Sequence, residues 1–249
     1  MSTELAEGCL LALGSLPGIG PASLLALHRD LGAEEAWRSI LEGRTDAHRA
    51  LAEAVVRLER ADATAHRRGP RGAARLVAAA SALDPAAVRD RHLAAGLAVL
   101  VEGSAGFPTR LVDDPAPPAV VLVQGDPELL DAPSVAIVGT RNATRLGCET
   151  ARHLAAALAD LGLGVVSGLA LGIDGASHRA LVDGPPRSGA PVGVVATGLD
   201  RSSPPATPGC RRRWRSGVRW SRRCRWAAGR PPGGSPHATA SSLRSPRRW

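Results

Sequence analysis

Three short apolar runs between residues 135 and 196 alternate with helix-like stretches, and this alternation constrains the fold more than any other feature. The runs are rich in valine, as strands buried on both faces are. Between residues 151 and 161, alanine and leucine recur at helical spacing. Parallel strands need a crossover connection, which is usually a helix. We therefore predict an α/β fold with an incomplete Rossmann-like parallel sheet, whose strands lie at residues 135–138, 164–167 and 192–196.

The first 80 residues follow a different pattern, with alanine, leucine and arginine at three- and four-residue spacing that predicts helices. The run Leu-Pro-Gly-Ile-Gly-Pro at residues 16–21 interrupts them and predicts a tight turn of the helix-hairpin-helix type. Such a turn can hold a nucleic-acid phosphate on its amides, but it can equally be a plain turn between two helices. The hairpin contains no arginine, so any contact with DNA there would be weak.

These patterns divide the chain into four segments. We predict a small helical domain of the helix-hairpin-helix or SAM-like type at residues 1–80 and a connecting segment at 81–105. An incomplete Rossmann-like domain follows at 106–200, and a tail at 201–249. Two additional short strands are predicted at residues 97–101 and 119–123.

The net charge of +8 is unevenly distributed along the chain. Residues 1–200 contain 18 arginines and all 23 acidic residues, which gives −5, whereas residues 201–249 contain 13 arginines and no acid, which gives +13. Lysine and tyrosine are absent, and there is one phenylalanine. The basic character that would indicate nucleic-acid binding therefore belongs to the tail rather than to the folded part.

The four cysteines do not form a metal or disulfide pattern, because no Cys-x-x-Cys occurs. The N-terminus is acidic where a signal peptide would be basic, and no apolar run reaches the length of a membrane span. We expect a cytoplasmic protein with no membrane association, no metal and no cofactor.

Three loops follow the predicted strands, at the sheet edge where α/β proteins bind ligands. The first combines glycine, two threonines and Arg141, which together suit a phosphate, and the second runs from Ser167 to Asp174. Asp174 is placed to cap the helix that carries His178, and a lone histidine there is more often structural than catalytic. The third loop is Thr197-Gly198-Leu199-Asp200. We predict DNA or phosphate binding by Gly139, Thr140, Arg141, Thr144, Gly147, Ser167, Gly168, Leu169, Ala170, Gly172 and Asp174.

Taken in order, these motifs resemble the bacterial DNA-processing family DprA/Smf over about residues 10–200. The resemblance rests on the hairpin, on Phe-Pro-Thr-Arg-Leu at 107–111, on Gly-Thr-Arg at 139–141 and on Ser-Gly-Leu-Ala-x-Gly-Ile-Asp at 167–174. It implies a non-enzymatic protein that binds single-stranded DNA and helps to load the RecA recombinase in natural transformation and recombination. It also implies RecA contact and a homodimer through the Rossmann-like domain. Leu171 stands where many members carry arginine.

The tail departs from this family, which continues with a Phe-Pro-x-Arg-Asn-Arg motif. The tail can also be translated in a shifted reading frame, in which each new codon combines the third base of one recorded codon with the first two bases of the next. Residues 219–227 can then encode leucine-valine-serine-glutamate-valine-proline-leucine-glycine. Residues 234–243 can encode phenylalanine-proline-threonine-arginine-asparagine-arginine, followed by two branched aliphatic residues and alanine. We predict a frameshift near Asp200–Ser203, and a disordered residue 201–249 tail that packs on nothing.

Two alternatives stay open at this point. One is a nucleotide-binding enzyme that resembles the phosphoribohydrolases with a related Rossmann-like fold, although their Pro-Gly-Gly-x-Gly-Thr loop is absent from this chain. The other treats the tail as a genuine basic arm that binds nucleic acid. No pair of nucleophile and base is evident, so we expect no catalytic residues.

Overall fold

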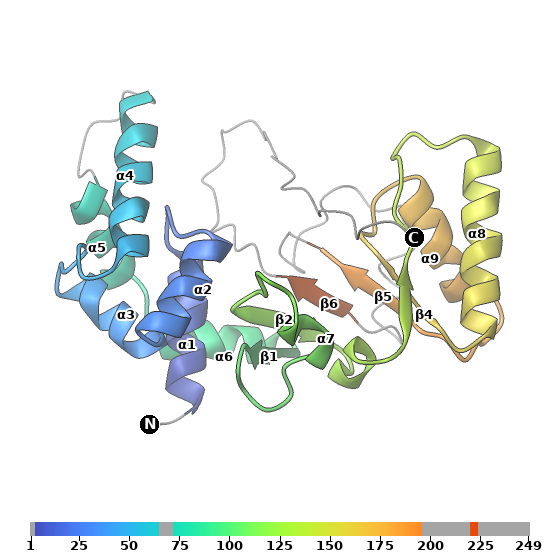
Figure 1. The fold of residues 1–249 in the computed structure, drawn as a ribbon, viewed down its shortest axis with the longest axis horizontal. Coiled ribbons are helices and arrows are strands. Elements are labelled where there is room, and N and C mark those ends of the chain that lie inside the picture. Colours follow the sequence, from blue (N-terminus) through green and yellow to red (C-terminus); the bar gives the residue numbers. More distant parts are fainter. Residues whose placement is uncertain (1–2, 65–71, 196–219, 224–249) are drawn as a thin grey trace.

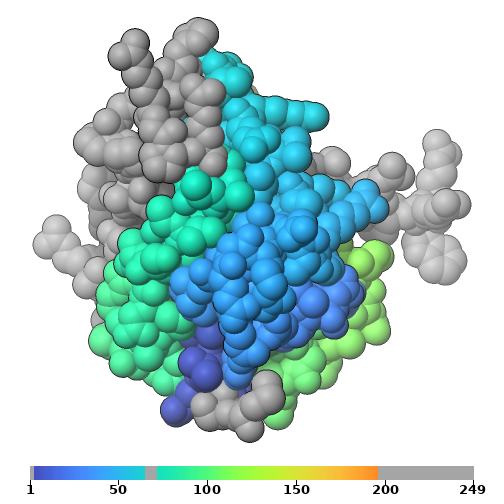
Figure 2. Space-filling view, turned by 90° about the vertical axis from the view of Figure 1, so that its left-hand side faces the viewer, coloured from blue at the N-terminus to red at the C-terminus, as the bar shows by residue number. Residues whose placement is uncertain are grey.

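The computed structural model describes residues 3–64 and 72–195, together with the backbone of residues 220–223. The N-terminal part is a group of helices, seen at the left of Figure 1 and from their outer side in Figure 2. They are α1 (Thr3–Ser15), α2 (Pro21–Asp30), α3 (Ala33–Leu41), α4 (Arg49–Thr64), α5 (Gly72–Ser81) and α6 (Pro85–Ala94). Proline at the first helical position begins both α2 and α6, and Asp84 caps α6 by accepting the Ala86 amide.

A mixed sheet follows, with the strand order β1-β2-β6-β5-β4-β3. Its strands are β1 (Leu97–Val101), β2 (Val120–Gln124), β3 (Ser134–Ala136), β4 (Gly164–Ser167), β5 (Pro191–Val194) and β6 (Trp220–Arg223). β1 and β2 form an antiparallel pair, and β2 is also antiparallel to β6. From β6 to β3 all neighbours are parallel.

The two long helices of the parallel part, α8 (Arg145–Asp160) and α9 (Ile173–Val182), pack against each other and against β4. Both connect neighbouring strands in the same direction across the sheet, and right-handed crossovers then place them on one face. Figure 1 shows them side by side at the far end from the N-terminal helices. The short helices α7 (Thr109–Val112) and η1 (Pro127–Leu130) flank β2 in the chain.

Strand β2 is buried on both faces. Val120 and Leu122 belong to the same hydrophobic core as the N-terminal helices, whereas Val121 and Val123 pack with Phe107 on the other side. A separate core lies beneath α8 and α9 and contains Ile137, Ala155 and Val165. The N-terminal helices and the β1–β2 pair are therefore joined by one continuous apolar core.

The predicted fold class is confirmed: helices precede a sheet whose β3, β4 and β5 are parallel and connected by helices. Strand positions agree within about two residues, and β4 coincides with the predicted 164–167. Residues 81–105, predicted as a connecting segment, contain α6 and β1, which pack on the core and on β2.

The prediction that the whole tail packs on nothing is wrong for residues 220–223. These residues form β6, which pairs with β2 on one side and with β5 on the other. Trp-Ser-Arg-Arg lacks the apolar alternation of a strand, so sequence pattern alone does not reveal it. The remaining residues of the predicted disordered tail lie outside the described ranges.

The turn of the predicted helix-hairpin-helix, between α1 and α2, packs against α4. The Arg57 guanidinium on α4 donates from Nε to the Gly18 carbonyl at 3.0 Å and from Nη2 to Ser23 Oγ at 2.8 Å. The hairpin lacks an arginine of its own, and α4 supplies one that holds the turn in place. These contacts are what a structural turn between helices requires.

Because Leu122 is fully buried in the shared core, we expect Leu122→Ala to destabilise the fold by about 2–5 kcal/mol, through lost contacts and a cavity. Urea unfolding followed by circular dichroism measures this loss. Val112→Ala removes an apolar side chain that is 58% exposed and should change stability by less than about 0.5 kcal/mol. Equal effects of the two substitutions would contradict the shared core.

Candidate nucleic-acid interface

The first two predicted loops meet at the carboxyl ends of β3 and β4. The loop after β3 leads into α8, and the loop after β4 leads into α9. The third predicted loop, at residues 197–200, lies outside the described residues. The structure therefore brings together the Gly-Thr-Arg turn and the Ser-Gly-Leu-Ala loop, as the order of the motifs predicts.

The two loops touch through their backbones, and glycine makes this approach possible. Gly172 has φ +82°, and a β-carbon there would collide with the Thr140 carbonyl oxygen. A β-carbon at Gly139 would lie 2.6 Å from Cγ1 of Ile173. The Ile173 amide donates to the Thr140 carbonyl at 3.3 Å. A side chain at Gly172 would therefore push the loop backbones apart, and a side chain at Gly139 would displace the Ile173 side chain.

The carboxylate of Asp174 connects the two loops by hydrogen bonds. Its Oδ1 accepts the Gly139 amide and its Oδ2 accepts the Gly168 amide, both at 3.1 Å, and the residue is only 6% exposed. The cap position of α9 is Gly172, so the predicted capping role of Asp174 is wrong. Because both carboxylate oxygens face loop amides, Asp174 positions the loops and does not present its charge to a ligand.

Several other predicted binding groups also form bonds inside the loops. Ser167 Oγ donates to the Ile137 carbonyl at 2.6 Å and is buried. The Gly147 amide donates to Thr144 Oγ1, which caps α8. Amides that are already bonded, including those of Gly139, Gly147 and Gly168, cannot also serve a phosphate at full strength.

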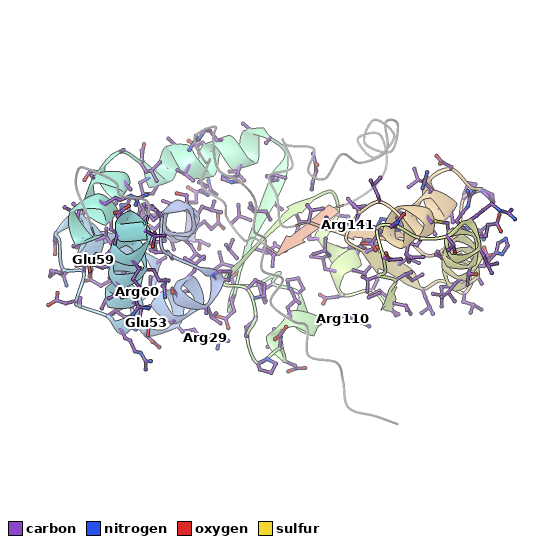
Figure 3. All side chains as sticks on the ribbon, turned by 90° about the horizontal axis from the view of Figure 1, so that it is seen from above. Arg29, Glu53, Glu59, Arg60, Arg110 and Arg141 are labelled. Atoms are coloured by element: carbon purple, nitrogen blue, oxygen red, sulfur yellow. The ribbon has the colours of Figure 1, made fainter. Side chains whose placement is uncertain are left out.

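The groups that can face a ligand are fewer than the sequence predicts. Arg141 is exposed on the loop that leads into α8, as Figure 3 shows. The hydroxyls of Thr140 and Thr144 each accept one amide and keep their own hydrogen for donation. Arg145 is also exposed, but it pairs with Glu149 at 2.8 Å. Arg141 is thus the predicted site residue with the clearest route to an anion.

The remaining predicted residues, Leu169 and Ala170, lie in the second loop. Leu169 has φ +58°, a left-handed conformation that costs a side-chain-bearing residue roughly 1–3 kcal/mol. Its side chain lies over Gly193 of β5, where a β-carbon would be 2.8 Å from Leu169 Cδ1. The absent side chain at Gly193 therefore makes room for this strained residue.

Comparisons with known proteins connect this geometry to a family. A profile of the family described as DNA recombination-mediator protein A matches residues 98–217. The DNA processing protein DprA of Bacillus subtilis is 37% identical over 110 residues, which are 44% of this chain and 36% of that protein. Protein Smf of Synechocystis is 29% identical over 203 residues, which are 78% of this chain and 45% of that protein. The X-ray structure of DprA from Streptococcus pneumoniae aligns with a TM-score of 0.50 and 26% identity, and it covers 66% of this chain and 55% of that one.

The chain is similar to the DprA/Smf family over residues 98–217. It spans less than half the length of the two curated DprA and Smf relatives. The DprA family match begins within β1, includes both loops and ends at residue 217, beyond the motifs that end at Asp200. Within the described residues, no helix is long and apolar enough to cross a membrane, and no three histidine, cysteine or acidic side chains gather as a metal site would need.

Sequence reasoning missed the positioning role of Asp174 and overestimated the number of loop amides that are free to bind a ligand. The partners of Asp174 lie 35 and 6 residues away, so only the packing of the two loops reveals them. His178 is in the core, as its structural interpretation predicts: its Nε2 lies 3.2 Å from the Val165 carbonyl.

Asp174→Asn should destabilise the chain by about 1–3 kcal/mol, because an amide side chain keeps one acceptor and turns a donor toward the other loop amide. Amide exchange by NMR should show lost protection at Gly139 or Gly168, and Asp174→Ala should remove it at both. The matched control is Asp183→Asn, the same charge change at an exposed position that ends α9. Unchanged protection in Asp174→Ala would contradict the positioning role.

Burial lowers the pKa of His178 from 6.5 to about 4. Between pH 6.5 and pH 4, His178 is protonated in the unfolded chain but stays neutral in the folded chain. The free energy of unfolding should therefore fall as the pH drops from 6.5 toward 4. The full contribution is roughly 3 kcal/mol, present above pH 6.5. Urea midpoints between pH 7.5 and 4.5 should fall less steeply in His178→Asn than in the original chain. Parallel pH profiles would show that His178 is not responsible.

Proposed function

We propose that this chain is a single-stranded DNA-binding recombination mediator of the DprA type, which assists RecA loading and is impaired by a change of reading frame in its tail. The family description and the names of the relatives support a role in DNA processing. The choice of single-stranded DNA and of RecA comes from the family resemblance. Arg141 carries the proposal for this chain, because it projects from a loop whose backbone is held on both sides.

The surroundings of Arg141 suit an unpaired strand. Thr140 and Thr144 offer hydroxyl donors for phosphate, and three side chains of the two loops and the start of α8 are exposed: Val138, Leu146 and Leu171. Unpaired bases expose faces that a duplex hides, and proteins stack such bases on aromatic side chains or on arginine guanidinium planes. An exposed arginine that can stack on a base as well as bind a phosphate therefore favours a single strand over a duplex.

The enzyme alternative finds no support in these loops. Both oxygens of Asp174 accept loop amides, and burial keeps His178 neutral at physiological pH. A general acid or base must reach its substrate, and these groups face the protein interior. We propose that the site binds DNA without catalysis.

We expect Arg141→Ala to weaken binding of a fluorescein-labelled oligothymidine about 5- to 20-fold at low salt, and to reduce the salt dependence by roughly 0.7 in the log–log slope. Fluorescence anisotropy measures both quantities. The matched control is Arg152→Ala, which removes an exposed arginine from the outer side of α8. If both variants bind equally well, Arg141 does not carry the interface.

The basic-arm alternative needs its own measurement. A synthetic peptide of residues 201–249, the whole tail, should bind the same oligonucleotide more weakly than the full chain, if the loops form the interface. Equal affinity and an equal salt slope for the peptide would instead assign binding to the arm.

A further inference from the structure

Leu169 is the one residue other than glycine with a positive φ, +58°, in the part of the chain that the structure describes. A residue with a side chain keeps this left-handed conformation only where its surroundings enforce it, and such residues gather at functional sites. Leu169 lies in the loop after β4, within the candidate interface. Its conformation therefore requires a contact that holds it, and its location connects that contact to the interface.

The contact that holds Leu169 is made on β5. Gly193 is buried and has no side chain, and the end of the Leu169 side chain occupies the space next to it. A β-carbon at position 193 would lie 2.8 Å from Cδ1, 3.1 Å from Cγ and 3.3 Å from Cδ2 of Leu169. These distances are shorter than ordinary van der Waals contact, so even a methyl group at position 193 would displace the leucine.

The other end of the same loop lies against the backbone that carries Arg141. A β-carbon at Gly172 would lie 2.8 Å from the Arg141 carbonyl oxygen. The adjacent Ile173 amide donates to the Thr140 carbonyl at 3.3 Å. Residues 169–172 therefore connect β5 to the segment that carries Arg141, with a close contact at each end.

We propose that Leu169 is a positioning residue: its side chain, packed on Gly193, fixes the second loop, and that loop fixes the backbone from which Arg141 reaches a DNA phosphate. This role needs no contact between Leu169 and DNA, and it differs from the direct binding that the sequence predicts for Leu169. A backbone that is already fixed leaves less conformational freedom to be lost when a ligand binds. The effect on DNA affinity rests on the proposed function, whereas the positioning of the loop does not.

Two substitutions and their combination test this role. Gly193→Ala should displace Leu169, and Leu169→Ala should remove the side chain that packs on Gly193. Each should weaken binding of fluorescein-labelled oligothymidine about 3- to 10-fold and reduce the protection of the Ile173 amide from hydrogen exchange. The salt slope should stay unchanged, because Arg141 is still present.

Both substitutions break the same contact, so their effects should not multiply. We expect the double variant to bind at least about threefold more tightly than the product of the two single losses predicts. Gly193 is buried and has no side chain to offer to DNA, which excludes a lost direct contact as the cause of its effect. Losses that multiply fully would show that the two positions act independently, and the proposal would be wrong.

The matched control is Val192→Ala. Val192 is the neighbouring buried residue of β5, and successive residues of a strand point to opposite faces of the sheet. This substitution should lower the urea midpoint of unfolding without changing the Ile173 protection or the affinity for oligothymidine. If Val192→Ala reduces protection and affinity as strongly as Gly193→Ala, general stability of β5 explains the effect and the positioning role is rejected.

Arg141→Ala separates this proposal from the proposed function. If Arg141→Ala weakens binding and Gly193→Ala does not, Leu169 does not position Arg141 and the proposal is wrong. If Arg141→Ala leaves the affinity unchanged, the proposed function fails at this loop. Lost Ile173 protection in Gly193→Ala would then still support the positioning of the loop, and unchanged protection would overturn it.

Discussion

The burial of β2 on both faces is the constraint on which the rest of the structure depends. One face joins the core of the N-terminal helices, and the other closes a small core around Phe107. β1 pairs along one edge of β2, and β6 pairs along the other. The helical part and the sheet therefore cannot separate without exposing Val120 and Leu122. Among the described strands, β6 is the one that hydrogen-bonds both to β2 and to the parallel strand β5.

At the opposite end of the sheet, a smaller interaction shapes the proposed interface. The two carboxylate oxygens of Asp174 accept hydrogen bonds from amides of two loops. The glycines at positions 139 and 172 let those loops approach each other. The amides of Gly139 and Gly168 are therefore engaged by Asp174 and are not free to bind a phosphate. Arg141 therefore extends from a loop whose backbone is fixed by hydrogen bonds to Asp174. We expect an anion at this site to be bound mainly by the Arg141 side chain and less by backbone amides.

Much of the fold was predictable, because its evidence is local. Valine-rich runs place β2 and β4 within about two residues, and the helical spacing at residues 151–161 falls in α8, which begins earlier, at Arg145. The glycine-containing loops predict which ends of the strands carry the site. The role of Asp174 was not predictable, since it depends on an amide 35 residues away. β6 was not predictable either, because Trp-Ser-Arg-Arg has no strand pattern and its place is decided by the open edges of β2 and β5. Local pattern identifies elements, whereas contacts between distant segments decide which groups remain free.

Electrostatics then limits how the interface can work. Residues 1–200 carry −5, so long-range attraction of DNA to the folded part is not available as it would be on a basic surface. Charges beyond roughly 8 Å are screened at physiological ionic strength, and the neighbourhood of Arg141 matters most. There, Asp174 is turned inward and Glu149 is paired with Arg145. These two carboxylates are therefore already engaged by other groups and do not neutralise Arg141. DNA binding through Arg141 depends on short-range contacts rather than on the net charge of the chain.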